Sequence, residues 1–351
     1  MSEKDFVPST FHLAIMQQTE RELAWHGQPF LPWQTRLRAR LIDLIGDYPS
    51  ERVPLDVEIT EREETDEYVR IKLVFTGEPH ADVPAHLLVP RDAEGALPGM
   101  ICLQGHSPGM HISIGVANDE HEQELVEGDR DFAVQAVRNG FLALAIEQRC
   151  FGERSETLQE QRSDHGCQDA TMHSLLLGRT VQAERTWDVM RAIDLLEGLP
   201  EVLPGDDLEG VWLDPDRLGC MGNSGGGTTT FYAACLEPRI RLAVVSCAFC
   251  TYAHSLMRIY HCPDNYIPGI LKVAETGELA GLIAPRGLLV VAGREDSIFP
   301  IEGVRQAFET AEEIFRAAGC AENIELIVGE GGHRFYAQES WPVIRRMLDT
   351  V

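Results

Sequence analysis

The chain of 351 residues is 44% hydrophobic and 25% charged, which is typical of globular proteins and excludes a disordered or fibrous chain. Its length exceeds the roughly 150 residues of a common domain, so it allows two domains or one large α/β domain with additions. The formal net charge of −26 is spread along the chain, and such a field opposes binding to nucleic acid and to anionic membranes. We therefore expect a neutral or cationic small molecule as the ligand.

The N-terminal segment mixes charged and apolar residues and lacks the continuous apolar stretch of a signal peptide. No stretch approaches the roughly 18 apolar residues of a membrane span, so we expect a cytoplasmic protein, either a monomer or a homo-oligomer. The nine cysteines are odd in number and lie mostly in apolar runs, which predicts reduced core residues. His165, Cys167 and His173 lack the paired short spacings of a zinc site, and we expect neither a metal nor another cofactor.

Residues 1–52 predict a helical N-terminal arm that packs against the main domain, with breaks at Pro29, Pro32 and Pro49. The pattern then changes to short segments that are rich in β-branched residues and divided by charged or Gly/Pro turns, at residues 53–60, 68–77 and 81–90. These segments predict an antiparallel β extension that leads into a larger sheet.

From residue 99 onward, short continuous apolar runs alternate with helical patterns. Continuous runs suit strands that are buried on both faces, and they occupy residues 99–103, 141–146, 218–221, 242–246, 287–292 and 324–328. Helices are expected at residues 130–138, 180–199, 303–318 and 340–348. This alternation predicts an α/β fold over residues 53–351, with a mostly parallel sheet flanked by helices. Insertions at residues 105–128 and 150–178 follow predicted strands, so we expect them to line the ligand crevice.

Residues 222–227 read Gly-Asn-Ser-Gly-Gly-Gly and follow directly after a predicted buried strand. A flexible turn or a phosphate-binding loop are alternatives, but the second needs a Lys and Ser/Thr pair or a dinucleotide spacing that is absent here. The pattern G-x-S-x-G instead favours a nucleophile elbow, in which Ser224 occupies a strained turn between strand and helix. A serine hydroxyl needs a base and an orienting acid to act as a nucleophile.

In this arrangement the acid and the histidine follow the serine in chain order, each after a later strand. Asp296 comes after the run at residues 287–292 and is the candidate acid, with its neighbour Glu295 as the alternative. His333 lies in a glycine-rich loop after the run at residues 324–328 and is the candidate base. Ser224, Asp296 and His333 are therefore the predicted catalytic residues.

Such a mechanism also requires an oxyanion hole of backbone N–H groups. One donor is expected from Gly225, which follows the nucleophile, and the other from the loop at residues 104–109. Within that loop we favour His106, with Ser107 as the alternative.

At these residues the sequence resembles the α/β-hydrolase superfamily, and within it the acetyl xylan esterase and dienelactone hydrolase-like branch. The resemblance covers about residues 53–350 and is most specific at LLLGRT, TWDVMRAIDLLEGLPEV and DPDRLGCMGNSGGGTTTFYAACLEPRI. It implies a carboxylic ester hydrolase that removes acetyl groups from sugars, with a Ser/Asp/His triad and no metal. The segment EQRCFGERS departs from the D-x-R-G-x-G turn of many relatives, so residues 147–153 are expected to shape a different pocket.

The leading hypothesis is a serine esterase that deacetylates a small acetylated sugar or a similar ester, because the expected lack of export disfavours polymeric xylan. A prolyl-oligopeptidase-like peptidase uses the same triad order, but about ninety N-terminal residues are too few for its β-propeller. A third hypothesis is a non-catalytic ligand-binding scaffold, since fold alone does not dictate function.

Overall fold

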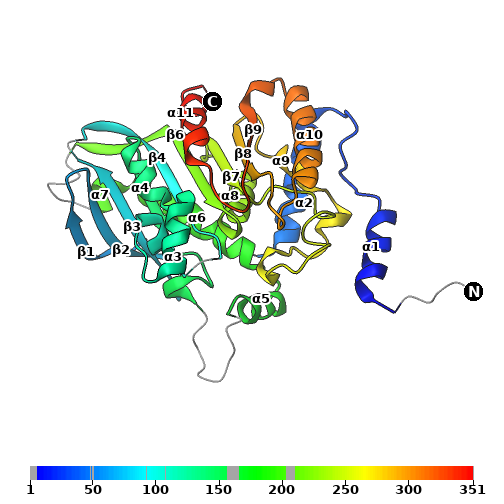
Figure 1. Ribbon diagram of the computed structural model, residues 1–351, viewed down its shortest axis with the longest axis horizontal. Helices are drawn as coiled ribbons and strands as arrows, with labels where there is room; N and C mark the ends of the chain where they lie inside the picture. Colours follow the sequence, from blue (N-terminus) through cyan, green and yellow to red (C-terminus); the bar gives the residue numbers. More distant parts are fainter. Residues whose placement is uncertain are drawn as a thin grey trace, which may run out of the picture.

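The computed structural model describes residues 6–47, 49, 51–91, 93–106, 108–155, 166–202 and 210–350 (Figure 1). Within these residues, strands of a nine-stranded sheet lie in the order β1-β2-β3-β5-β4-β6-β7-β8-β9. Their bounds are β1 Glu58–Glu64, β2 Tyr68–Glu78, β3 Ala81–Pro90, β4 Gly95–Leu103, β5 Leu142–Ile146, β6 Val211–Asn223, β7 Leu242–Ser246, β8 Gly287–Gly293 and β9 Ile324–Gly329.

The sheet is antiparallel at one end and parallel over the rest. β1, β2, β3 and β5 pair antiparallel in succession, whereas β5, β4, β6, β7, β8 and β9 pair parallel. The predicted α/β fold, with its antiparallel extension and mostly parallel sheet, is confirmed. β1 has the sequence EITEREE and is exposed throughout, so charged side chains protect this edge of the sheet from further pairing.

Helices cover both faces of the sheet. Their bounds are α1 Pro8–Gln18, α2 Phe30–Ile45, α3 Glu120–Leu125, α4 Phe132–Arg138, α5 Gly166–Leu176, α6 Val181–Glu197, α7 Leu199–Val202, α8 Gly225–Leu236, α9 Thr276–Ala280, α10 Ile301–Ala317 and α11 Ala337–Leu348. Buried residues of α2, α6, α8 and α10 share one hydrophobic core with the sheet, and those of α4 and α11 share a second core on its other face. The central strands are therefore buried on both sides, as their continuous apolar runs predict.

The two helices of the N-terminal segment differ in their packing. α1 has no buried residue and stands apart from the sheet in Figure 1. In contrast, α2 buries Trp33, Leu37, Leu41 and Ile45 in the larger core. The expected break at Pro32 is wrong, because this residue lies in the first turn of α2, where a missing N–H leaves no intrahelical bond unmade. The boundary between an arm at 1–52 and a domain at 53–351 stays a prediction.

None of the helices among the described residues combines the length and the apolar character needed to cross a membrane.

Candidate active site

Ser224 lies at the turn between β6 and α8. No loop separates the two elements, because β6 ends at Asn223 and α8 begins at Gly225. The backbone of Ser224 has φ 57° and ψ −124°, an unfavourable conformation for a residue with a side chain. Its N–H donates to the carbonyl of Ser246 at the end of β7, at 2.9 Å. Strand pairing and the helix start thus hold the strained turn that the G-x-S-x-G pattern predicts.

The glycines around Ser224 are required by close backbone contacts. A Cβ atom at Gly226 would lie 2.2 Å from the carbonyl oxygen of Leu103, and one at Gly222 would lie 2.4 Å from the carbonyl carbon of Gly226. Real Cβ atoms do not approach backbone atoms this closely, so a larger residue would force β4, β6 and α8 apart. The small neighbours therefore allow the helix start to pack directly on the strand ends.

Asp296 and His333 meet at the ends of two neighbouring strands. Asp296 follows β8, and its Oδ2 lies 2.8 Å from Nδ1 of His333, which follows β9. Its Oδ1 accepts hydrogen bonds from the N–H groups of Ile298 and Phe299 at 2.8 and 3.1 Å. Glu295, the alternative acid, is exposed. The structure therefore places Asp296, and not Glu295, in contact with the histidine.

The electrostatics of this pair favour an ionised carboxylate. Burial raises the pKa of Asp296, but the hydrogen bond with His333 and the two backbone N–H groups outweigh burial, so the pKa lies below its ordinary value. An ionised Asp296 accepts a hydrogen bond from the Nδ1–H group of His333, which leaves Nε2 of His333 as the acceptor of a further hydrogen bond.

The elbow and the acid–histidine pair are linked through the end of β7. Ser246 accepts from the N–H of Ser224, and the next residue is Cys247. The sulfur of Cys247 and the nearest polar atoms of Asp296 and His333 all lie within 4.8 Å of one another. The candidate nucleophile, acid and base therefore lie at the same edge of the sheet, where the parallel strands end.

The candidate oxyanion donors also lie beside Ser224. Gly225 is the first residue of α8, and the first N–H groups of a helix have no intrahelical acceptor. A Cβ atom at Gly105 would lie 2.9 Å from Cβ of Ser224, and one at Gly225 would lie 2.9 Å from Nδ1 of His106. The loop after β4 therefore packs on the elbow, while Ser107, the alternative donor, lies outside the described residues.

Comparisons with known proteins agree with this architecture. The model of the Abhydrolase family matches residues 14–181. "Putative hydrolase YtaP" of Bacillus subtilis (strain 168) is 26% identical over 305 residues, which cover 84% of this chain and 92% of that protein. A "putative acetyl xylan esterase" from Bacteroides fragilis NCTC 9343 has a similar structure, with a TM-score of 0.77, 16% identity and coverage of 98% of this chain and 95% of the other. The chain has the α/β-hydrolase fold.

Other solved esterases share the fold at lower similarity. A glucuronoyl esterase from Solibacter usitatus has a TM-score of 0.63 at 14% identity, and the match covers 91% of this chain and 92% of the esterase. Acetyl xylan esterase 1 from Thermoanaerobacterium sp. JW/SL YS485 has a TM-score of 0.53 at 19% identity, with 96% and 98% coverage. At these levels of identity the similarities concern the fold.

The two insertions begin next to the elbow, at the carboxyl ends of the parallel strands β4 and β5. The buried carboxylate of Glu147 accepts from the N–H of Met110 at 3.1 and 3.2 Å, which joins the loop after β5 to the loop after β4. The ring of Phe151 lies edge-on to that of His106, with centroids 4.8 Å apart. Burial raises the pKa of Glu147 to about 7 although backbone N–H groups oppose this shift. Residues 156–165 of the second insertion lie outside the described residues.

Sequence reasoning did not identify the partner of His106. Nε2 of His106 lies 3.1 Å from Oδ2 of Asp264, which also forms an ion pair with the buried Arg185 at 2.9 Å. Burial lowers the pKa of His106, but the hydrogen bond with Asp264 outweighs it and raises the pKa to about 9. Asp264 lies in the short 3₁₀ turn η4, Pro263–Asn265, in the long connection after β7. An acid in a loop without periodic pattern carries no sequence signal, so only the fold reveals this contact.

Proposed function

We propose that the protein is a serine carboxylic ester hydrolase that works through an acyl-enzyme. The observation that carries the proposal is the 2.8 Å contact of Asp296 with His333, at the sheet edge where Ser224 occupies its strained turn. A nucleophile, a base and an orienting acid in this chain order are the parts that acyl transfer requires.

In the proposed reaction, Nε2 of His333 takes the proton of Ser224 while Oγ attacks the ester carbonyl. Asp296 keeps the imidazole in the tautomer with a proton on Nδ1 and stabilises the imidazolium that forms. The N–H groups of Gly225 and His106 donate to the negative oxygen of the tetrahedral intermediate. His333 then protonates the leaving alcohol, and water, activated in the same way, releases the acid from Ser224.

We propose a small acetylated sugar or a similar ester as the substrate. The similarity to acetyl xylan esterases supports acetyl esters, and the similarity to glucuronoyl esterases makes methyl esters of glucuronic acid the matched comparison. A panel of acetylated mono- and disaccharides and methyl glucuronate, with kcat/KM measured for each, separates these classes. Higher kcat/KM on the glucuronate esters would contradict the acetyl assignment.

Labelling with a fluorophosphonate, followed by intact mass and peptide mapping, tests the nucleophile. We expect one adduct, on Ser224, that is absent in Ser224→Ala and strongly slowed in His333→Ala. On an activated acetate ester, Ser224→Ala should lower kcat by at least about 10³-fold, because the acyl-enzyme no longer forms. Turnover that survives in Ser224→Ala would overturn the proposal.

A further inference from the structure

Four side chains with metal-binding atoms converge next to the elbow. His106 comes from the loop after β4, Cys167 from the first turn of α5, and Cys262 and Asp264 from the segment at η4. One nitrogen, two sulfurs and one carboxylate oxygen from these residues all lie within 4.8 Å of one another. We call this set the His106 cluster.

The spacing and chemistry of the His106 cluster suit a tetrahedral divalent cation. Zinc binds sulfur at about 2.3 Å and nitrogen or oxygen at about 2.0–2.2 Å, which places neighbouring ligand atoms roughly 3.3–3.8 Å apart. The 3.1 Å between Nε2 of His106 and Oδ2 of Asp264 is already close to this value. The remaining separations, at most 4.8 Å, need only small rotamer adjustments. A set of two thiolates, imidazole and carboxylate favours zinc over the hard cations magnesium and calcium.

The state of the Asp264 carboxylate is a second, independent observation. Its side chain is completely buried. Its Oδ2 lies 2.9 Å from Nη1 of Arg185 and 3.1 Å from Nε2 of His106, whereas its Oδ1 has no hydrogen-bond partner among the described residues. Buried carboxylates are normally fully hydrogen-bonded or bound to a metal. A cation in the cluster would supply the missing partner.

The charge balance of the site also agrees with a bound divalent cation. Arg185 is fully buried, its Nε and Nη2 donate to the carbonyl of Arg149 at 3.0 and 2.7 Å, and its guanidinium lies 4.3 Å from the ring centre of Phe151. Two thiolates and Asp264 carry three negative charges, and the cation with Arg185 carries three positive charges. The loaded cluster is therefore neutral, which is the favourable state for a buried site.

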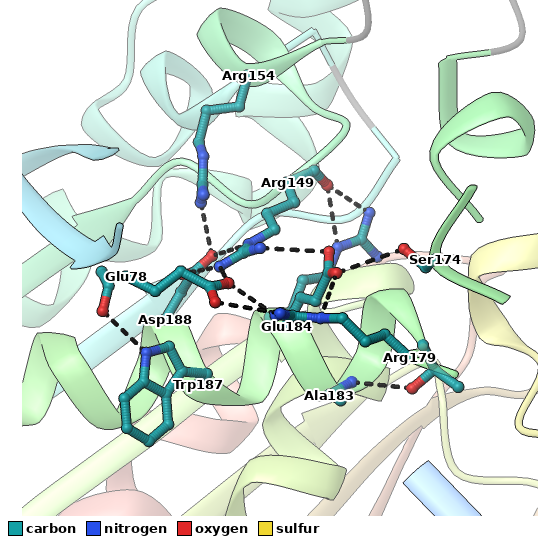
Figure 2. A network of polar contacts seen from close by, with 12 residues as sticks. Glu78, Arg149, Arg154, Ser174, Arg179, Ala183, Glu184, Trp187 and Asp188 are labelled. Atoms are coloured by element: carbon teal, nitrogen blue, oxygen red, sulfur yellow. Dashed lines mark hydrogen bonds and ion pairs between the residues drawn. The ribbon is translucent and has the colours of Figure 1, made fainter. Parts of the chain in front are cut away.

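Arg185 donates to the carbonyl of Arg149, and Arg149 belongs to the polar network in Figure 2. Arg149 donates to both carboxylate oxygens of Asp188 on α6, at 2.9 and 3.0 Å. Arg154 donates to the same carboxylate at 2.6 Å. This network joins residues 149–154 to α6. Because Arg185 lies on α6 and contacts the carbonyl of Arg149, its guanidinium is held in place beside the His106 cluster.

We propose that His106, Cys167, Cys262 and Asp264 bind one zinc-type divalent cation that ties the loop after β4 to α5 and η4. The role is structural: the cation would hold the loop that packs against Ser224, and no step of ester hydrolysis is assigned to it. His106, about 35% exposed, provides the path of entry. This proposal departs from the expectation that the protein binds no metal. Of His165, Cys167 and His173, which the sequence analysis considered as a metal site, only Cys167 belongs to the His106 cluster.

The test uses the full chain, stripped with a chelator and kept reduced with a phosphine. Titration with Zn²⁺, followed by gel filtration and elemental analysis, should give one equivalent per chain. Cys167→Ser and Cys262→Ser should each weaken binding by about 100-fold or more, since each removes a direct ligand. Cys320→Ser, a cysteine outside the cluster, is the matched control and should bind like the parent chain. With Co²⁺ as the probe, the thiolate charge-transfer absorption should be present in the parent and in the control, and reduced in the two ligand variants.

Loss of folding is excluded by thermal unfolding with and without Zn²⁺. The metal should raise the Tm of the parent chain and of Cys320→Ser, and not that of Cys262→Ser. No stoichiometric binding, or equal binding by the parent and the two ligand variants, would overturn the proposal. The readout is metal content, so the proposal can fail or hold independently of ester hydrolysis, and Ser224→Ala should bind the metal unchanged.

Discussion

Oδ2 of Asp296 lies 2.8 Å from Nδ1 of His333, while Oδ1 of the same carboxylate accepts from two backbone N–H groups of its own loop. The carboxylate is thus fixed on one side by the loop and directs the imidazole with its other oxygen. A carboxylate held in this way orients its histidine and does not merely neutralise it.

Asp296→Asn should lower kcat on an activated acetate ester by about 10³–10⁴-fold, because the amide supports the wrong imidazole tautomer. Steady-state kinetics check this, and KM should change little because Asp296 does not contact the substrate in the proposed mechanism. Glu295→Gln changes the exposed neighbouring carboxylate and is the control. Equal losses in both variants would show that loop charge, and not the His333 contact, sets the rate.

Gly226→Ala should destabilise the protein by more than about 2 kcal/mol and abolish labelling of Ser224, because the new Cβ would lie 2.2 Å from the carbonyl oxygen of Leu103. Chemical denaturation and fluorophosphonate labelling measure the two effects. Gly128→Ala is the control, since no atom lies within 4 Å of its added Cβ. A Gly226→Ala variant with parental stability would refute the close contact between β4 and α8.

Glu147→Gln should alter how stability depends on pH. The folded-state pKa of about 7 lies above the ordinary value of about 4.3, so the folded chain keeps a proton that the unfolded chain releases. The free energy of unfolding of the parent chain should therefore fall, relative to the variant, as pH rises from about 4 to 7, by up to roughly 3 kcal/mol. Urea unfolding of both chains at several pH values measures this difference.

Glu309→Gln, which changes an exposed carboxylate on α10, is the control for this experiment. Its stability should follow the pH dependence of the parent chain. A constant difference between the parent and Glu147→Gln from pH 4 to 7 would contradict the raised pKa.

Leu37→Ala should destabilise the protein by about 2–5 kcal/mol, because α2 buries this side chain completely in the larger core. Phe11→Ala in α1 should change stability by no more than about 0.5 kcal/mol, since its ring is 63% exposed. Guanidinium unfolding of the two variants compares the helices. Equal effects would mean that α1 and α2 contribute to the fold in the same way.

Much of the fold can be predicted because the central strands are short, continuous apolar runs. The run at 287–292 corresponds to β8, Gly287–Gly293, and the run at 242–246 to β7, Leu242–Ser246. Their helical partners follow the 3.6-residue pattern; in α6, the stripe of Trp187, Met190, Ile193 and Leu196 is buried. The elbow is predictable for a similar reason, since its glycines are required by local backbone contacts.

The surroundings of the elbow were less predictable, because they arise from contacts between separate loops. His106 and Asp264 belong to loops after different strands, and Cys167 joins them from a third segment. Loops carry no periodic pattern, so the sequence places each residue after its strand but does not indicate which side chains meet. The break expected at Pro32 failed because proline is tolerated in a first helical turn, a position that composition alone does not specify.

The loop that carries His333 contacts a segment that lies much earlier in the sequence. Nη2 of Arg130 donates to the carbonyl of His333 at 3.0 Å, across a sequence separation of 203 residues. Contacts of such large separation form slowly, because the entropy of loop closure opposes them until the intervening chain is ordered. We therefore expect the meeting of Ser224, Asp296 and His333 to be a late event in folding, and partly folded chains to contain an elbow serine without its base.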